Sequence, residues 1–201
     1  VRDEPQATRQ LRADLVIGAD GLRSVVGRRL GLAGRLPWPF PRRVAFVAHW
    51  RDVRGIGAHG EMHVERDGYV GLADVGHGET NVAIVVPRAL AKDASGDPAG
   101  FMTRWLAARP QLAARFDGAT RVSPVRATGP FAVRARRAWA PGALLAGDAA
   151  DFFDPFTGEG IYAALRGGEL LGPYAHDALR APSRDAARRA LAAYDAARRR
   201  E

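Results

Sequence analysis

The sequence contains no cysteine. This excludes disulfide bonds, catalysis by a thiolate and zinc held by cysteine ligands, and it leads us to expect a cytoplasmic protein. No apolar run approaches the roughly 18–20 residues that a membrane-spanning helix needs. The charged stretch Val1–Pro5 does not resemble a signal peptide. We therefore predict no transmembrane segment, although peripheral contact with a membrane stays open.

Lysine is almost absent as well, since Lys92 is the only one. The net charge of +8 therefore comes from arginine, and an arginine-rich nucleic-acid-binding module is one interpretation. The arginines are spread along the chain, however, and are not interleaved with aromatic residues that could stack on bases. We favour solvated arginine faces and predict no nucleic-acid partner. In the alanine-rich C-terminal stretch this applies to Arg188, Arg189, Arg198, Arg199 and Arg200.

The length of 201 residues, with 47% hydrophobic residues, is enough for one domain with a sizeable core, alone or with part of another. The apolar stretch 13–19 ends in glycine and aspartate, as a buried parallel strand does where it meets a loop. Residues 142–148 repeat this pattern. Helices are expected over 22–31, closed by Gly31, and over 159–171, ended by Pro173.

The middle of the chain follows a different pattern. Residues 33–42 are rich in proline and glycine and mark the crossing into it. Beyond them, alternating residues predict an antiparallel sheet with a hairpin turn at Asp67–Gly68. A helix is expected over 98–115. The expected strands are 43–50, 61–66, 69–74, 80–86, 121–127 and 130–136.

These patterns predict a mixed α/β fold in which two α/β pieces come together and an antiparallel sheet is inserted between them in sequence. The expected boundaries are 1–36 for the first piece, 37–138 for the inserted domain and 139–201 for the second piece.

The most informative stretch runs from Leu144 to Ile161. Asp148 ends a predicted strand, where ligands bind in open α/β sheets, and could accept a hydrogen bond from a sugar or ribityl hydroxyl. Gly158 and Gly160 bracket a helix start, where missing side chains admit a ligand and the helix dipole favours negative charge by about 0.3–1 kcal/mol. Pro155 would restrict the backbone conformation of the segment that leads to this helix start. The alternative is a loop that merely turns the chain, which would not need this order of residues.

This stretch resembles the second FAD motif of the flavoprotein hydroxylase (aromatic hydroxylase) superfamily, which begins with Gly-Asp-Ala-Ala, here 147–150. Residues 154–161 are most similar to the geranylgeranyl-reductase-like branch. The hydroxylases often have histidine where this chain has Asp151. The resemblance implies FAD as cofactor, with Asp148 on the ribityl chain and the Gly158–Ile161 backbone facing the flavin. The implied cofactor-binding residues of this stretch are Gly147, Asp148, Pro155, Gly158, Glu159, Gly160 and Ile161.

A second stretch, Val16–Ser24, resembles the Asp-Gly motif of the same superfamily. The resemblance implies that Asp20 and Gly21 help to hold FAD, that Asp20 shapes the path of NAD(P)H, and that Arg23 adds a charge suited to phosphate. The family usually places arginine three residues after the serine. This chain has Gly27 there, with Arg28 next.

A third glycine-rich stretch, 55–60, matches GxGxxG but precedes an alternating strand, whereas a dinucleotide fingerprint opens a helix. We interpret it as a loop and expect the true fingerprint upstream of Val1. We therefore expect this chain to be a C-terminal fragment that binds FAD poorly and is inactive on its own. His59 and His63 have a spacing that could suggest a metal, but no third ligand is near them in sequence, and we predict no metal site.

The strands at 68–73 and 81–86 resemble the superfamily's substrate-domain sheet, which would cover one face of the flavin. Trp50, Met62 and Tyr69 are candidates to line the substrate pocket, and a core role for each is the alternative.

The resemblance implies an FAD-dependent oxidoreductase, reduced by NAD(P)H, that hydroxylates or reduces a lipophilic, phenolic or polyprenyl small molecule. The flavin would carry the chemistry, so no catalytic side chain is assigned. The alternatives are a flavin-dependent halogenase, a non-catalytic remnant and the arginine-rich nucleic-acid-binding module.

Overall fold

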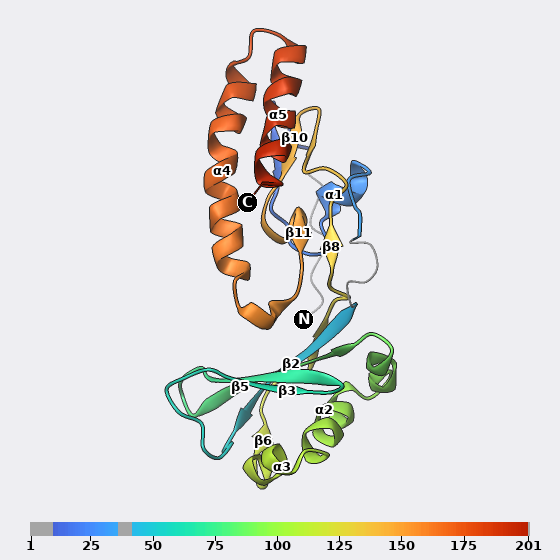
Figure 1. The fold of residues 1–201 in the computed structure, drawn as a ribbon, viewed down its shortest axis with the longest axis vertical. Helices are drawn as coiled ribbons and strands as arrows, with labels where there is room; N and C mark the ends of the chain where they lie inside the picture. The colour runs from blue at the N-terminus through green and yellow to red at the C-terminus, as the bar shows by residue number, and fades with distance from the viewer. Residues whose placement is uncertain (1–9, 36–41, 201) are drawn as a thin grey trace. The chain divides into compact units, whose positions relative to one another are not determined.

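The computed structural model describes residues 10–35 and 42–200 and has a mixed α/β fold (Figure 1). The chain forms two compact units: unit 1 comprises 1–35 and 133–201, and unit 2 comprises 36–132. The crossing segment predicted at 33–42 lies partly outside the described residues, at 36–41.

Unit 1 is built on a short sheet whose strands come from distant parts of the sequence. The strands are β1 (Val16–Gly18), β10 (Ala143–Leu145) and β9 (Trp139–Ala140), in the order β1-β10-β9. β1 and β10 run parallel, with Gly18 opposite Leu145. The two predicted apolar strands on either side of the middle block are therefore neighbours. A second pair joins β8 (Val133–Arg134) to β11 (Asp151–Phe152).

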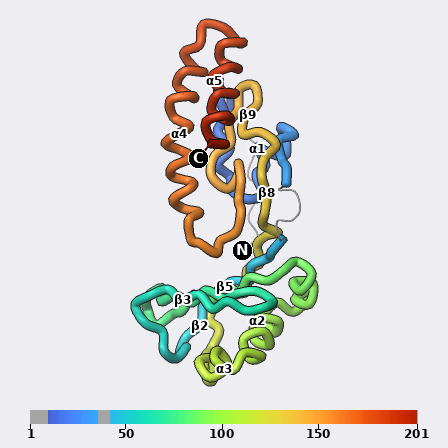
Figure 2. Tube along the Cα trace, viewed as in Figure 1, coloured from blue at the N-terminus to red at the C-terminus, as the bar shows by residue number. Residues whose placement is uncertain are grey.

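In the described part of unit 1, three helices and two 3-10 turns accompany these strands. They are α1 (Val25–Arg29), η2 (Gly147–Ala149), η3 (Pro155–Thr157), α4 (Gly160–Arg180) and α5 (Arg184–Arg198). α4 and α5 lie side by side (Figure 1, Figure 2). Leu171 and Ala175 of α4 are buried in one cluster with Leu191 of α5 and Leu144 of β10.

The prediction that Pro173 ends α4 is wrong, because the helix continues to Arg180 with Pro173 in its interior. Proline removes one backbone hydrogen bond and crowds the preceding turn. Buried Leu171 and Ala175 lie on either side of it, and their packing keeps the chain helical beyond the proline.

Unit 2 contains a six-stranded antiparallel sheet in the order β3-β4-β5-β2-β6, with β7 also paired to β2. Its strands are β2 (Arg43–Arg51), β3 (Glu61–Glu65), β4 (Gly68–Asp74), β5 (Glu79–Pro87), β6 (Thr120–Arg121) and β7 (Arg126–Thr128). The strand expected at 121–127 is split into β6 and β7 around Pro124, and only β8 forms within 130–136. Proline cannot donate to a sheet ladder, which explains the break.

The predicted hairpin between β3 and β4 is present, but its turn lies one residue earlier, at Arg66–Asp67. Gly68 is already paired with Glu65 as the first residue of β4. It has a φ of 153°, and a Cβ there would lie 2.3 Å from the carbonyl oxygen of Val85. Gly68 therefore serves the close approach of β4 and β5.

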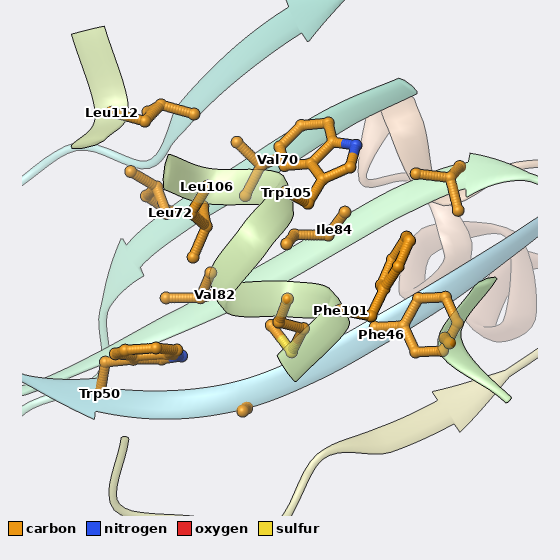
Figure 3. Close-up of a cluster of buried hydrophobic side chains, with 14 residues drawn as sticks. Phe46, Trp50, Val70, Leu72, Val82, Ile84, Phe101, Trp105, Leu106 and Leu112 are labelled. Atoms are coloured by element: carbon orange, nitrogen blue, oxygen red, sulfur yellow. The ribbon is translucent and has the colours of Figure 1, made fainter. Parts of the chain in front are cut away.

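One face of this sheet is covered by η1 (Leu90–Ala94), α2 (Pro98–Ala107) and α3 (Pro110–Phe116). The single helix predicted over 98–115 is thus two helices, because Pro110 starts a new one as its first residue. Phe101, Trp105 and Leu106 of α2 pack onto Val70 and Ile84 of the sheet (Figure 3).

None of the helices in residues 10–35 and 42–200 combines the length and apolar character needed to cross a bilayer.

Candidate functional site

Both glycine- and aspartate-containing motifs of unit 1 leave the sheet at the same edge. β1 and β10 are parallel and in register, and the Ala146 N–H donates to the Gly18 carbonyl oxygen at 3.0 Å, just past the strand ends. The Asp20–Gly21 loop and the Gly147–Asp148 turn therefore start beside each other. The carboxyl edge of parallel strands is where open α/β sheets bind ligands.

Asp20 is exposed and caps α1. Its Oδ2 accepts hydrogen bonds from the backbone N–H groups of Val25 at 2.6 Å and Val26 at 3.2 Å. A hydrogen bond with the Ser24 side chain, followed by these backbone bonds, lowers the pKa of Asp20 below its ordinary value. The carboxylate is therefore ionised at neutral pH and fixes the start of α1 against the end of β1.

Gly27 stands where the superfamily usually has arginine, and the packing around it explains why. Gly27 is buried, and its N–H donates to the Ser24 Oγ at 2.8 Å. A Cβ at this position would lie 3.2 Å from that oxygen and 3.5 Å from Leu145 Cδ1, which leaves little room for a side chain. The next residue, Arg28, carries a guanidinium that donates to the carbonyl oxygen of Arg23.

The Gly147–Asp148 turn connects the sheet edge to α4. Gly147 has a φ of 55°, and a Cβ there would lie 3.3 Å from the Cβ of Ala164 in the first turns of α4. Asp148 is half-buried, and this burial raises its pKa, with the negative charge of Asp151 adding to the effect. The turn thus places a partly desolvated acceptor next to the beginning of α4.

The stretch before α4 forms a tight approach to the helix. The Asp154 Oδ1 accepts from the Phe156 N–H at 3.1 Å across Pro155, and Gly158 adopts the left-handed conformation with a φ of 73°. Glu159 accepts from the Thr157 hydroxyl at 3.1 Å. Within the described residues no side chain caps the first turn of α4. A helix start of this kind presents donor N–H groups and a positive dipole end.

The start of α4 is also open and apolar. A Cβ at Gly158 or at Gly160 would have no heavy atom of the described residues within 4 Å. Ile161 is 78% exposed and Phe156 is 43% exposed. Exposed apolar side chains that gather beside polar groups are typical of a binding surface.

Sequence reasoning missed the contribution of α5 to this region. The Tyr194 hydroxyl donates to the Leu145 carbonyl oxygen at 2.8 Å, and the Asp195 Oδ1 accepts from the Ala138 N–H at 2.8 Å. Arg198, which we expected to be solvated, is only 12% exposed and forms an ion pair with Asp151 at 2.7 Å. The spacing of Leu191, Tyr194 and Arg198 by three and four residues was the available signal for a buried face.

In unit 2 the three candidate pocket residues do not share a face. Trp50 belongs to the core beneath α2 and α3, with its ring 5.3 Å from that of Phe116. Met62 and Tyr69 lie on the opposite face, because side chains alternate along a strand and Tyr69 pairs with Val64. Tyr69 is buried, with the Arg43 guanidinium 5.9 Å from its ring centre.

We call the accessible part of that opposite side the open face. Small residues form its middle, where Gly71 pairs with Ala83, Ala83 pairs with Val47, and Met62 pairs with Gly71. A Cβ at Gly71 would touch the Met62 Cε at 3.8 Å, so the methionine side chain lies beside this glycine. The residues of the open face are Val47, His49, Met62, Val64, Gly71, Ala73, Asn81 and Ala83.

The GxGxxG-like stretch 55–60 is a loop between β2 and β3. Arg115 of α3 donates to the carbonyl oxygens of Arg54 and Gly55 at 2.8 Å and to both carboxylate oxygens of Glu61. His63 lies 2.9 Å from the same carboxylate. The residues that the structure describes contain no cluster of histidine and carboxylate side chains suited to a metal ion.

Comparison with known proteins places this geometry in context. A protein-family model described as "FAD binding domain" matches residues 1–201. A digeranylgeranylglycerophospholipid reductase of Methanosarcina mazei is 28% identical over 86% of this chain and 42% of its own length. Digeranylgeranylglycerophospholipid reductase 1 of Methanococcoides burtonii is 30% identical over 86% of this chain. The chain spans 41% of that second relative.

Solved structures share the fold. The myxobacterial chondrochloren halogenase CndH superimposes with a TM-score of 0.81 over 94% of this chain and 44% of its own, at 21% identity. Pseudomonas aeruginosa PqsL, solved in complex with 2-aminobenzoylacetate, gives a TM-score of 0.65 at 26% identity over 94% of this chain and 52% of its own.

Proposed function

Because the chain belongs to the FAD binding domain family, we propose that unit 1 holds FAD at the edge where β1 and β10 end. The observation that carries this proposal is the convergence of two motifs on that edge. Parallel pairing of β1 with β10 puts the Asp20 loop beside the Gly147–Asp148 turn, and Gly147 packs on Ala164 of α4.

The residues present fit a flavin dinucleotide. Gly158 and Gly160 leave the backbone accessible, and α4 begins without a side-chain cap in the described residues. Asp148 offers carboxylate oxygens to a polyol hydroxyl, and exposed Phe156 and Ile161 offer apolar surface to a planar ring. When bound, FAD would supply the transfer of electrons to or from a substrate.

Each part of the site has a distinct task in this proposal. Asp148 accepts a hydrogen bond from the ribityl chain, and the backbone N–H groups after Gly158 favour negative charge on the flavin through the dipole of α4. Asp20 acts mainly by fixing α1, since its Oδ2 already accepts from Val25 and Val26. Gly21, Arg23, Pro155 and Glu159 shape the surroundings of the cofactor.

We further propose that the full-length protein is an FAD-dependent oxidoreductase that uses NAD(P)H as reductant. Its substrate would be a lipophilic, phenolic or polyprenyl small molecule, in keeping with the lipid named in both curated relatives. The open face of unit 2 supports an apolar substrate, because its middle is formed by Gly71, Ala83 and Val47. Met62 and Tyr69 remain our candidates for substrate contact, whereas Trp50 is assigned to the core. The absence of cysteine supports a cytoplasmic location.

The test uses the full-length protein that contains this chain. We expect the purified protein to be yellow, to keep its flavin absorption through gel filtration and to oxidise NAD(P)H when a polyprenyl or phenolic substrate is added. A halogenated product would instead identify the halogenase alternative. A folded, colourless protein that does not take up added FAD would refute the cofactor proposal and favour a remnant or a binding module.

A further inference from the structure

Two residues one helical turn apart on α5 reach the two ends of the Gly147–Asp148 turn. The Tyr194 hydroxyl donates to the carbonyl oxygen of Leu145, the last residue of β10, at 2.8 Å. The Arg198 guanidinium donates to Asp151, the first residue of β11, at 2.7 Å. Residues four apart lie on the same side of a helix, so one face of α5 holds both ends of the turn.

The Tyr194 contact is shielded from water, whereas the ion pair of Arg198 is shielded on the arginine side only. Tyr194 is fully buried, and this burial raises its pKa to about 12, so its hydroxyl remains a donor at neutral pH. The side chain of Arg198 is 12% exposed, and that of its partner Asp151 is 45% exposed. Hydrogen bonds between charged groups are shorter and stronger than neutral ones, and partial burial reduces their screening.

The backbone between the two anchors is fixed as well. The Ala150 N–H donates to the Gly147 carbonyl oxygen at 2.9 Å and closes the turn, while the Ala150 carbonyl oxygen accepts from the Ala135 N–H at 2.7 Å. A displacement of either anchor would therefore move Asp148. Asp151 also acts on Asp148 electrically, since its negative charge contributes to the raised pKa of that residue.

We propose that Tyr194 and Arg198 are positioning residues of the flavin site, which hold the Asp148 carboxylate and the Gly147 backbone where a ribityl chain can bind. The proposal rests on the proposed binding of FAD to unit 1. In this chain the position after Gly-Asp-Ala-Ala is Asp151, and its pairing with Arg198 makes the conformation of the turn depend on a helix outside both motifs.

The experiment compares FAD affinity with folding stability in the full-length protein. Arg198→Gln removes the charge and Tyr194→Phe removes one hydroxyl while it keeps the ring. We expect FAD dissociation constants to rise roughly tenfold or more for Arg198→Gln and several-fold for Tyr194→Phe. The visible circular dichroism of the bound flavin should change in both variants, because the ribityl contact is displaced.

Two controls separate positioning from general loss of structure. Leu191→Ala weakens the packing of the same helix, and Arg188→Gln removes an exposed arginine of the same helix. Below their unfolding temperatures both should bind FAD as the wild type does. The charge exchange Asp151→Arg with Arg198→Asp should recover affinity that either single substitution loses.

The outcomes are distinguishable. If the wild type binds no FAD, both this inference and the proposed function fail. If the wild type binds FAD but Tyr194→Phe and Arg198→Gln change its affinity no more than Leu191→Ala does, the positioning role is wrong and the cofactor site stands. If Arg198→Gln does not fold, Tyr194→Phe alone decides between these results.

Discussion

Single glycines determine how closely the elements of unit 1 approach each other. A Cβ at Gly18 would lie 2.7 Å from Leu145 Cδ2 and 2.9 Å from Val26 Cβ. Both distances are shorter than side-chain carbons tolerate, so β10 and α1 can flank the end of β1 only because this residue has no side chain. Gly160, at the start of α4, has open space around it instead.

Gly18→Ala should therefore destabilise the protein by about 1–3 kcal/mol, the usual cost of forcing extra atoms into a packed region. Urea unfolding followed by circular dichroism measures this loss. Gly160→Ala, which adds the same methyl group where no described atom lies within 4 Å, serves as the matched control. Equal stability of the two variants would show that the strand, helix and loop can move apart without cost.

Gly160→Ala should affect the cofactor rather than the fold. The substitution replaces glycine by a better helix former, so the free energy of unfolding should stay the same or rise by up to about 1 kcal/mol. FAD affinity should fall, because the methyl group would occupy space at the proposed flavin contact. Titration of the apoprotein with FAD, monitored by flavin fluorescence, gives the affinity. Unchanged affinity would show that the flavin does not contact this helix start.

At the scale of elements, one proline opposes the helix that contains it and another favours the helix that it begins. Pro173 lies inside α4, where it lacks a backbone donor, whereas Pro110 is the first residue of α3, where no donor is needed. The first is held in place by the packing of neighbouring turns. The second begins a helix that its own geometry favours.

Pro173→Ala should accordingly stabilise the protein, by at most about 3 kcal/mol, since it restores a backbone hydrogen bond on an exposed position of α4. Pro110→Ala should leave stability unchanged or slightly lower, because the fixed φ of proline suits that site. The two variants are compared by thermal unfolding. A destabilised Pro173→Ala would mean that the proline shapes a bend required for packing.

The ion pair between Glu61 of β3 and Arg115 of α3 should make the stability of unit 2 fall at acid pH. Hydrogen bonds from Arg115, and then from His63, lower the pKa of Glu61 from its ordinary value of 4.5 to about 2. Because the folded pKa lies below the unfolded one, the ionised carboxylate adds stability above about pH 4.5, and this is lost as the pH falls toward 2.

Glu61→Gln should therefore cost about 1–3 kcal/mol at neutral pH and progressively less between pH 4.5 and 2. Urea unfolding across this pH range measures the difference from the wild type. Glu65→Gln is the control, since Glu65 accepts from the neutral amide of Gln111 at 2.7 Å. A difference that does not change with pH would show that Glu61 contributes by packing alone.

Local sequence patterns correctly predicted those elements whose packing in the fold agrees with their own local preference for strand or helix. The alternation at 43–50 and 80–86 gave β2 and β5, and the apolar runs before Gly18 and Gly147 gave the parallel pair. Sequence reasoning failed where packing overrides local preference, as at Pro173. It also missed the polar contacts of Tyr194 and Arg198, because a helix far along the chain supplies partners that no local pattern reveals.

At the scale of the whole molecule, each unit has its own buried cluster. The core of unit 2 joins Phe46 and Ile84 of the sheet to Phe101 and Leu106 of α2, and its strands pair with one another. The core of unit 1 joins β10 to α4 and α5. Unit 2 is continuous in sequence, whereas unit 1 is assembled from two segments.

A polypeptide of residues 42–132 should therefore fold alone, with a cooperative urea transition and dispersed amide signals in its NMR spectrum. The segment 133–201 should not form a native unit by itself, because it lacks β1, the parallel partner of β10. A folded 133–201 together with an unfolded 42–132 would contradict this division of the molecule.

The pairing of Val16 with Ala143 has a consequence for how the protein is made. A ribosome delivers β1 first, but the strand that completes its ladder emerges only after all of unit 2 has been synthesised. Unit 2 can reach its folded state while the nascent chain is still growing. During that interval β1, with Val16 and Ile17, must wait without β10. The rate of translation through residues 43–132 therefore sets how long this apolar strand stays available to chaperones or to aggregation.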